Sequence, residues 1–373
     1  MKLFDVYPLF AIEPVRAEGS WIWDKAGTKY LDLYGGHAVI SIGHSHPAFV
    51  KAITDQLHKI SFYSNSVENP LQRKLADKLG ELSGYPDYQL FLCNSGAEAN
   101  ENALKLASFA TGRKKILAFR KAFHGRTSGA VAATDNPKIV SPFNAGHQIE
   151  FLPLNDQAAL QSALTPEVAA VIIEGIQGVG GIQVPNDSFL QWVASACRKN
   201  NSLLILDEIQ SGYGRTGKFF AHQYAGIRPD LITIAKGMGN GFPVGGVLIH
   251  PDIKSWHGML GTTFGGSYLA CAASLAVLEV LEKESLIANA AQLGSAWIQR
   301  LKSFAGILDV RGRGLMIGFD LPVNHTNLRS NLLEVHKIFT GEAKPNTIRL
   351  LPSLAITAGE GNLFFDALTR ELA

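Results

Sequence analysis

The sequence predicts an α/β fold: a large region built on a mostly parallel β-sheet, and a smaller α+β region. Three observations support this prediction. Between about residues 88 and 250, short apolar runs alternate with amphipathic stretches, which is the pattern of a parallel sheet covered by helices on both faces. After Gly266 the pattern changes to long helical stretches. The chain of 373 residues also exceeds what one hydrophobic core serves.

The first predicted elements follow in order along the chain, beginning in the N-terminal segment and continuing into the large region. Residues 20–33 form two alternating runs around a turn, which predicts a β-hairpin. Helices are predicted over 97–110 and 186–200, and the second has Asn186 or Asp187 as its N-cap. Six short apolar runs predict the strands of the main sheet: 89–93, 115–119, 169–174, 203–207, 231–235 and 245–249.

The smaller region is predicted to contain both ends of the chain. Residues 267–373 contain two long helical patterns, over 269–281 and 286–304, and strand patterns over 310–320 and 347–351. We expect three parts: an N-terminal segment 1–50 that joins the small domain, a large domain over 51–266, and a C-terminal small domain over 267–373.

Composition and charge exclude several classes of protein. There are 34 Lys and Arg residues against 32 Asp and Glu residues, a net charge of +2, and the basic residues form no run, so nucleic acid is not an expected partner. The N-terminus lacks the apolar core of a signal peptide, and no apolar stretch approaches the ~20 residues of a membrane span. We therefore expect a cytoplasmic protein without membrane contact.

Neither the cysteines nor the histidines predict a metal site. Cys93, Cys197 and Cys271 lie far apart in apolar surroundings, so we expect packed core residues instead of disulfides or metal ligands. His44 and His46 lack a carboxylate or cysteine at a fitting spacing, and a hydrogen-bonding role is expected for them.

Charged residues follow three of the predicted strands. The strand over 169–174 ends at Glu174, the strand over 203–207 ends at Asp207, and the strand over 231–235 is followed by Lys236. A single strand can end on a charge merely because it reaches water. Three such ends, with Gly237, Gly239 and Gly241 after the lysine, favour a binding site, because ligands of open parallel sheets bind at the carboxyl ends of the strands.

A lysine and an aspartate at neighbouring strand ends suit pyridoxal phosphate (PLP). A buried lysine loses its charge readily, and its neutral amine condenses with an aldehyde to a Schiff base. A carboxylate such as Asp207 can keep the pyridine nitrogen of PLP protonated. The turn at residues 94–97 offers backbone N–H groups at a helix start to the phosphate. Phe123 could stack on the ring, and Arg126 could bind a substrate carboxylate.

Eight segments in order along the chain resemble the class III, fold-type I PLP-dependent aminotransferases, and within them the acetylornithine/succinylornithine group. The resemblance implies the fold of that family, with a mostly parallel seven-stranded sheet and a small domain built from both chain ends. It also implies a homodimer with shared active sites. The segments that carry it are 30–32, 43–47, 94–100, 123–127, 207–212, 235–237, 262–266 and 349–352.

The resemblance implies a role for each matching residue. Lys236 would bind the cofactor covalently and move the proton, and Asp207 would pair with the ring nitrogen. The other cofactor-binding residues that it implies are Phe123, Gln210, Ser95, Gly96, Ala97 and, from the second subunit, Thr263. The substrate-binding residues that it implies are Arg126 and Arg349 as carboxylate readers and Ser64 and Asn65 at the pocket mouth. Glu174 is added as a candidate partner of Arg349, because the chain lacks the family's acid at position 179.

The chain departs from the family pattern at three positions. Val179 stands where relatives have an acid that pairs with the arginine matching Arg349, Val67 stands where an aromatic residue is common, and Ser267 replaces an Asn. Either the pairing with Arg349 is made by another group, or it is not made at all. The two valines also favour a larger, more anionic acyl chain, so we expect N-succinylornithine to be preferred over N-acetylornithine.

The expected function is therefore an N-acyl-L-ornithine:2-oxoglutarate aminotransferase of arginine biosynthesis that works by a ping-pong reaction. Two alternatives stay open at this point. The chain could be another ω-amino-acid aminotransferase of class III, of the ornithine or 4-aminobutyrate type. It could also be a non-catalytic protein that binds PLP.

Overall fold

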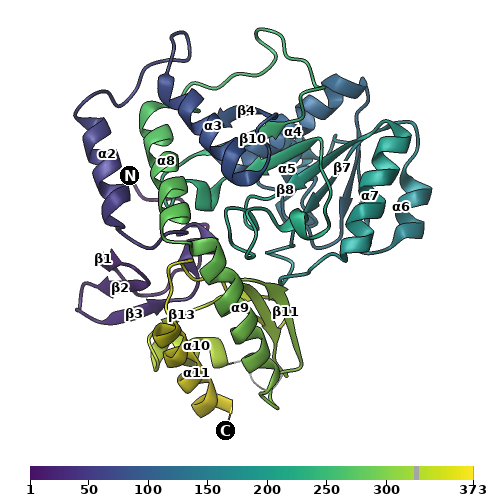
Figure 1. The fold of residues 1–373 in the computed structure, drawn as a ribbon. Helices are drawn as coiled ribbons and strands as arrows, with labels where there is room; N and C mark the ends of the chain where they lie inside the picture. The colour runs from purple at the N-terminus through teal and green to yellow at the C-terminus, as the bar shows by residue number, and fades with distance from the viewer. Residues whose placement is uncertain (323–326, 373) are drawn as a thin grey trace.

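The computed structural model describes residues 1–322 and 327–372 (Figure 1). A seven-stranded sheet forms its centre, in the order β4-β10-β9-β8-β7-β5-β6. β10 is antiparallel to both of its neighbours, and the other strands run parallel. The prediction of a mostly parallel sheet is confirmed. Its strands are β4 (Gln89–Cys93), β5 (Lys115–Phe119), β6 (Ile149–Leu152), β7 (Val168–Glu174), β8 (Leu203–Asp207), β9 (Leu231–Ile234) and β10 (Gly245–Ile249).

Helices cover both faces of this sheet. α4 (Gly96–Thr111) packs on one face, where its alanines and Leu106 contact Ile116, Ile172 and Ile205. α7 (Asp187–Asn200) and α6 (Gln157–Ala163) lie together on the other face. Alternate residues of each strand point to opposite faces, which explains why two separate apolar clusters flank the strands. Asn186 is the N-cap of α7, as predicted.

Two smaller sheets complete the fold. One has the order β1-β2-β3-β13 and joins the chain ends, because β3 pairs with β13 in parallel. The other has the order β11-β12-β15-β14. The strands of the two sheets are β1 (Pro14–Glu18), β2 (Trp21–Asp24), β3 (Lys29–Asp32), β11 (Asp309–Arg313), β12 (Met316–Asp320), β13 (Ile338–Phe339), β14 (Gly341–Ala343) and β15 (Thr347–Leu350).

The structure refines three sequence predictions. The strand pattern over 310–320 is a hairpin, β11 and β12, which turns at Gly314 in the left-handed region (φ 53°). The edge strand β6 was not predicted from the sequence. The helix expected over 286–304 ends at Lys302. The predicted division into domains at residues 50 and 266 stays a proposal.

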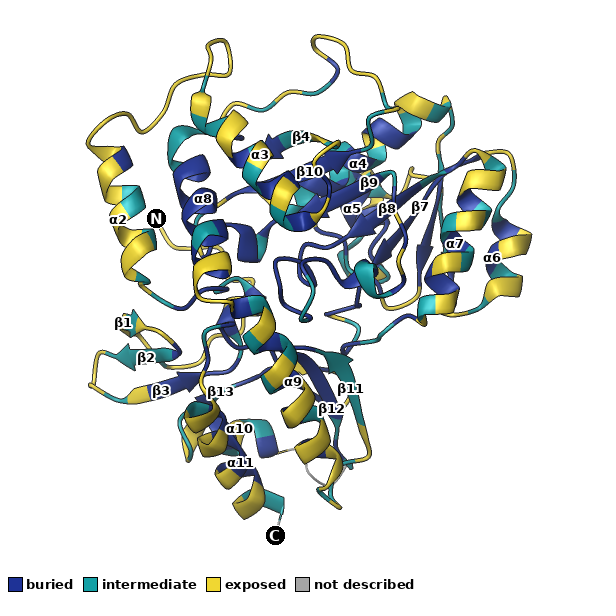
Figure 2. Ribbon diagram, in the orientation of Figure 1, coloured by how far each residue is buried: buried dark blue, intermediate teal, exposed yellow. Residues whose placement is uncertain are grey.

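The remaining helices surround these sheets. Two long loops, residues 58–69 and 250–267, extend from the upper side of the large region in Figure 1, and Figure 2 shows them mostly exposed. None of the described helices is both long and apolar enough to cross a bilayer. The helices not yet given are α1 (Gly35–Ala38), α2 (Pro47–Leu57), α3 (Pro70–Ser83), α5 (Ser128–Ala132), α8 (Tyr268–Lys283), α9 (Leu286–Lys302), α10 (Leu328–Glu334), α11 (Ala358–Leu372) and the 3-10 turns η1 (Pro137–Ile139), η2 (Pro142–Asn144), η3 (Ala221–Tyr224) and η4 (Lys236–Met238).

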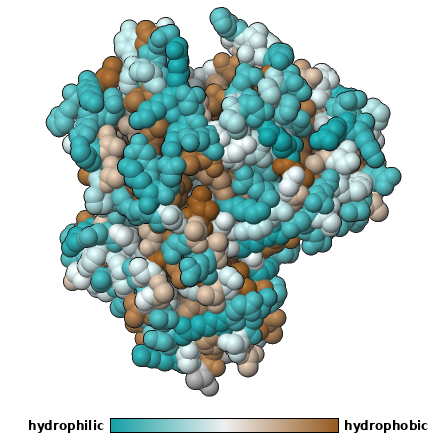
Figure 3. Space-filling model, viewed as in Figure 1, coloured by the Kyte–Doolittle hydropathy of each residue, from teal (hydrophilic) through white to brown (hydrophobic). Residues whose placement is uncertain are grey.

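The core runs through both regions. The strands of the main sheet are dark blue in Figure 2, while the outer faces of α2, α6 and α7 are yellow. The face seen in Figure 3 is mostly hydrophilic, with smaller hydrophobic patches between polar residues. The largest apolar cluster packs α8, α9 and α11 against the smaller sheets, so the large sheet and the small sheets share packed contacts.

Candidate active site

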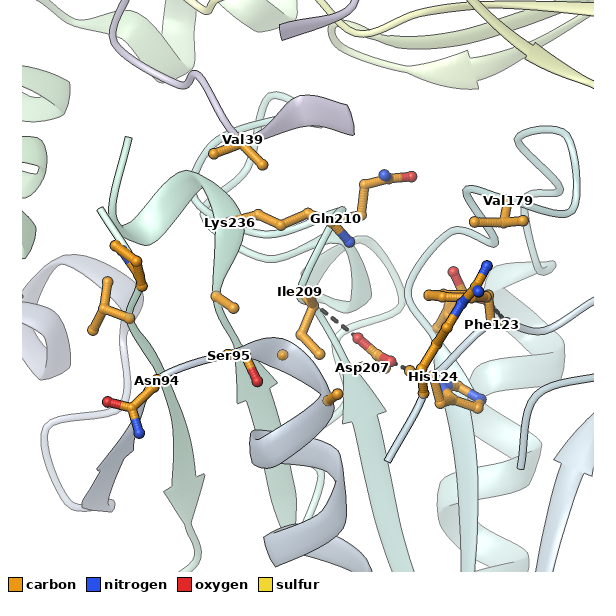
Figure 4. A pocket seen from close by; sticks show the side chains of 18 of the residues that line it. Val39, Asn94, Ser95, Phe123, His124, Val179, Asp207, Ile209, Gln210 and Lys236 are labelled. Atoms are coloured by element: carbon orange, nitrogen blue, oxygen red, sulfur yellow. Dashed lines mark hydrogen bonds and ion pairs between the residues drawn. The ribbon is translucent and has the colours of Figure 1, made fainter. Parts of the chain in front are cut away.

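The three charged strand ends meet at one cavity. β7 ends at Glu174, β8 ends at Asp207, and Lys236 begins the turn η4 after β9. All three line a cavity of about 400 Å³ at the carboxyl edge of the sheet, with part of the turn before α4 and the segment 123–126 (Figure 4). The parallel register puts Glu174 directly beside Asp207. The sequence prediction of one site at these strand ends agrees with this geometry.

Asp207 is held in place by three hydrogen bonds. Its Oδ2 accepts from Nδ1 of His124 and from Nδ2 of Asn100, both at 2.7 Å, and its Oδ1 accepts from the backbone N–H of Ile209 at 3.1 Å. Thr233 in turn donates to Oδ1 of Asn100 at 2.7 Å. The side chain is almost fully buried. These three donors fix the orientation of the Asp207 carboxylate at the cavity.

Lys236 has a strained backbone and a readily lost charge. Its φ of 47° lies in the left-handed region, which non-glycine residues rarely adopt and which is concentrated at functional sites. Burial lowers the pKa of its amine, while the negative charges of Asp207 and Glu174 oppose this effect. In Figure 4 the side chain extends across the cavity toward Gln210. A buried amine with a lowered pKa is suited to nucleophilic attack on an aldehyde.

The start of α4 forms an anion site in the cavity wall. Ser95 is the N-cap, and its side chain accepts from the N–H of Glu98 at 3.2 Å. The N–H groups of the first helical residues, Gly96 and Ala97, have no intrahelical acceptor and suit a phosphate. A Cβ at Gly96 would lie 2.8 Å from Cγ2 of Ile209, so only glycine fits there.

Glu174 and Phe123 are linked on the opposite wall. One oxygen of Glu174 accepts from the N–H of Phe123, and the other accepts from the N–H of Gly178, both at 3.0 Å. Burial raises the pKa of Glu174 to about 7, the negative charge of Asp207 adds to this effect, and the charge of His124 opposes it. Through its two hydrogen bonds, Glu174 links the backbone at Phe123 to the backbone at Gly178. It forms no hydrogen bond with Arg349 in this structure.

Arg349 and Gln210 lie on the side of the cavity nearest the smaller sheets. Gln210 lines the cavity, and its Nε2 donates to the carbonyl of His37 at 3.0 Å. Arg349, on β15, is buried beside the cavity, and its Nη1 donates to the carbonyl of Gly178 at 3.0 Å. Arg126 lines the cavity mouth and is exposed.

Four predicted site residues do not line the cavity of their own chain: Arg349, which lies beside it, and three loop residues. Ser64, Asn65 and Thr263 are exposed and lie in the two long loops. The loops contact each other, since Nδ2 of Asn65 donates to the carbonyl of Gly265 at 3.1 Å. The sequence prediction assigned Thr263 to the site of a second subunit, and its position outside its own cavity is compatible with that assignment.

Sequence reasoning missed four residues of the site: Asn100, His124, Tyr34 and His37. Asn100 and His124 are polar residues inside two of the segments that carried the resemblance, and this position is the sequence signal for them. In the structure both are buried and hydrogen-bonded to Asp207. Tyr34 and His37 carry no such signal, because they reach Arg349 only through the packing of both chain ends.

The donor set fits PLP. The aldehyde would meet Lys236, the ring nitrogen would meet Asp207, and the phosphate would meet the start of α4. Two buried polar atoms that line this cavity, Nε2 of His124 and Oε1 of Gln210, have no hydrogen-bond partner among the described residues. The described residues hold no cluster of three or more potential metal ligands.

Comparison with known proteins decides the family. A family model described as aminotransferase class-III matches residues 5–372. The chain belongs to the class-III aminotransferases. It is 41% identical to the acetylornithine aminotransferase of Archaeoglobus fulgidus over 349 residues, which cover 92% of this chain and 91% of the relative. It is 40% identical to the acetylornithine aminotransferase of Bacillus subtilis over 367 residues, which cover 96% and 94% of the two chains.

Solved structures share the fold of this class-III aminotransferase. An ornithine aminotransferase from Toxoplasma gondii matches with a TM-score of 0.91 and 28% identity, covering 98% of this chain and 91% of the other. An acetylornithine aminotransferase from Elizabethkingia anophelis matches with a TM-score of 0.84 and 30% identity, covering 98% and 94%. The chain is thus a PLP-dependent aminotransferase with the fold that the sequence predicted.

Proposed function

We propose that this aminotransferase transfers the δ-amino group of an N-acyl-L-ornithine to 2-oxoglutarate, as a step of arginine biosynthesis in the cytoplasm. The observation that carries the proposal is identity of about 40% to acetylornithine aminotransferases over more than nine-tenths of this chain. The conjunction of Lys236, Asp207 and the start of α4 in one cavity supports catalysis and counts against a non-catalytic PLP-binding protein.

Lys236 has two tasks in this proposal. Its amine would hold the cofactor, and after release it would accept and return the proton at the reacting carbon of the substrate. PLP, when bound, would supply an electron sink. Asp207 would pair with the ring nitrogen, and His124 and Asn100 orient the Asp207 carboxylate through hydrogen bonds at 2.7 Å.

Two arginines are proposed to bind the carboxylates of the two substrates. An N-acylornithine reacts at a carbon remote from its α-carboxylate, and glutamate reacts at a carbon remote from its side-chain carboxylate. One distal reader can therefore serve both substrates, and we propose Arg126, which lies exposed at the cavity mouth. Glutamate has a second carboxylate next to its reacting carbon, and we propose Arg349 for it.

We also propose a homodimer in which each subunit completes the site of the other. The loops 58–69 and 250–267 expose apolar side chains, among them Phe62 and Phe264, whose ring centroids lie 5.3 Å apart. Tyr63 and Val67 add to this exposed surface. A second copy of the chain would bury these side chains and bring Thr263, Ser64 and Asn65 to its partner's cavity.

A substrate panel tests the function. The holoenzyme is assayed with 2-oxoglutarate and, in turn, N-acetylornithine, N-succinylornithine, ornithine and 4-aminobutyrate, and the kcat/KM values are compared. The proposal expects the two N-acyl compounds to lead, with the succinyl compound preferred because Val179 and Val67 leave room for it. The fold similarity to ornithine aminotransferase makes ornithine the second candidate substrate. If ornithine gave the highest kcat/KM, the proposed N-acylornithine specificity would be wrong.

A further inference from the structure

Arg349 is a buried cation whose partners are all neutral. Its Nε donates to the carbonyl of Glu342 at 2.9 Å, its Nη1 to the carbonyl of Gly178 at 3.0 Å, and its Nη2 to the hydroxyl of Tyr34 at 3.2 Å. No carboxylate of the described residues forms an ion pair with it, although only 4% of the residue is exposed. Burial lowers the pKa of its guanidinium.

The nearby acids are engaged elsewhere. The carboxylate of Glu342 pairs with Arg329 at 2.9 Å. Both oxygens of Glu174 accept backbone N–H groups. Val179, where relatives of this family have an acid, lines the cavity without any charge. Among the described residues, Tyr34 is therefore the only side chain that is hydrogen-bonded to a nitrogen of Arg349.

His37 fixes the orientation of the Tyr34 hydroxyl. The hydroxyl oxygen is hydrogen-bonded to Nδ1 of His37 and also accepts from Arg349. A guanidinium can only donate, so the hydroxyl accepts from Arg349 and its own proton is free to point to His37 when Nδ1 of His37 is unprotonated. Burial and the positive charges of Arg349 and Lys236 lower the pKa of His37, which favours this neutral acceptor.

The backbone around Tyr34 and His37 is built for this contact. Gly35, Gly36, His37 and Ala38 all lie in the left-handed region, with φ between 56° and 68°. The amide of Gln210 holds this turn through the carbonyl of His37. The ring of Tyr34 occupies the space that a side chain at residue 341 would need, and that residue is a glycine.

We propose that Tyr34, oriented by His37, is a positioning residue that occupies Arg349 while N-acylornithine reacts and is displaced by the α-carboxylate of glutamate or 2-oxoglutarate. The inference rests on the proposed function, because, of its two amino donors, only the N-acylornithine lacks a carboxylate next to the reacting carbon, whereas glutamate has one. A charge-assisted bond to a carboxylate is roughly twice as strong as a bond to a neutral oxygen, so the exchange is favourable. A neutral partner here does the task for which relatives use an acid.

The Tyr34→Phe variant tests the displacement. It removes the hydroxyl and keeps the ring. The free enzyme and the N-acylornithine complex both lose the hydroxyl contact, whereas the 2-oxoglutarate complex does not use it. We therefore expect 2-oxoglutarate to bind the PLP-loaded holoenzyme about three- to tenfold more tightly in isothermal titration calorimetry, where no amino group is present to react. The ratio of kcat/KM for 2-oxoglutarate to kcat/KM for N-acylornithine should rise by a similar factor.

The His37→Gly variant and the double variant give an independent reading. Glycine accepts the left-handed backbone of residue 37 and removes only the imidazole. We expect the Kd for 2-oxoglutarate to fall in the same direction and by less than in Tyr34→Phe. The double variant should equal Tyr34→Phe alone, because His37 acts only through the hydroxyl. Additive effects would show that His37 acts independently of Tyr34.

A matched tyrosine serves as the control. Tyr88 lies immediately before β4, at the opposite edge of the main sheet, and its hydroxyl donates to the carbonyl of Pro229 at 2.6 Å. Tyr88→Phe should leave both the Kd and the kcat/KM unchanged. An unchanged or weaker 2-oxoglutarate affinity in Tyr34→Phe overturns the displacement. Lack of N-acylornithine turnover in the wild type overturns the proposed function instead, so the two failures are distinct.

Discussion

The Asp207→Asn variant tests the role of Asp207, because neither orientation of an asparagine amide can accept from all three hydrogen-bond donors around this position. Oδ2 accepts from His124 and Asn100, and Oδ1 accepts from the N–H of Ile209. An asparagine has one acceptor oxygen, so its NH₂ group must face either the Ile209 N–H or the pair of donors on the other side. Each orientation puts a buried donor against a donor.

The size of the effect follows from this mismatch. An unsatisfied buried group costs about 1–3 kcal/mol of unfolding free energy, which in a chain of this length lowers the apo Tm by about 1–4 °C. The catalytic loss is larger, since a neutral amide cannot keep the ring nitrogen protonated. We expect kcat to fall about 10²–10³-fold, as for the loss of one preorganised electrostatic partner, with most of the cofactor retained.

Differential scanning calorimetry of the apoprotein and steady-state kinetics with cofactor titration measure the two effects. The control is Asp230→Asn, a partly buried aspartate that accepts from the N–H of Leu204 at 2.7 Å at the opposite edge of the sheet. This control should lower stability without a matching loss of kcat. If Asp207→Asn turned over at the wild-type rate, Asp207 would not be the partner of the ring nitrogen.

Four further predictions follow from the site. Lys236→Ala should lower kcat by ~10²–10⁴-fold or more, with an unchanged circular dichroism spectrum. Normal turnover without added amine would contradict the role assigned to Lys236. Burial raises the pKa of Glu174 to about 7 from 4.5, so the folded protein holds an extra proton between these values. The unfolding free energy of the apoprotein should therefore fall by on the order of 1–3 kcal/mol as the pH rises through this window, and urea titrations of Glu174→Gln should lack this slope. Mixing inactive Lys236→Ala with an inactive Thr263 variant should restore activity through hybrid dimers, whereas sedimentation of a fully active monomer would refute shared sites. Val179→Glu should weaken 2-oxoglutarate binding several-fold by offering Arg349 an acid, and calorimetry that shows no change would mean that residue 179 does not reach it.

Much of the fold could be predicted because the large sheet is buried on both faces. Strands such as 203–207 are continuous apolar runs that end at a charged residue, and such runs are visible in sequence. β6 was missed because Ile149–Leu152 is an edge strand of four residues with a glutamate in it. The hairpin β11–β12 was read as one strand region because its turn at Gly314 interrupts the pattern only briefly.

The sequence predicted which residues lie together where they follow strand ends, and it missed contacts that depend on packing between distant segments. Lys236 and Asp207 are positioned by β9 and β8, whose register is local to the sheet. The contact of Tyr34 with Arg349 joins residues 315 positions apart in the chain, and no periodicity encodes it. The three loop residues that do not line their own cavity could be placed by resemblance only.

The parallel pairing of β3 with β13 has a consequence for the synthesis of this protein. Leu31 pairs with Ile338, and the N–H of Leu351 donates to the carbonyl of Leu33 at 2.8 Å. The N-terminal strands must therefore wait for partners that leave the ribosome about 300 residues later, which takes roughly 15–60 s at ordinary translation rates. The large sheet can form during this interval, but the contact of Tyr34 with Arg349 cannot. A chain that is released early thus keeps Lys236 and Asp207 but lacks Arg349, the proposed second carboxylate reader.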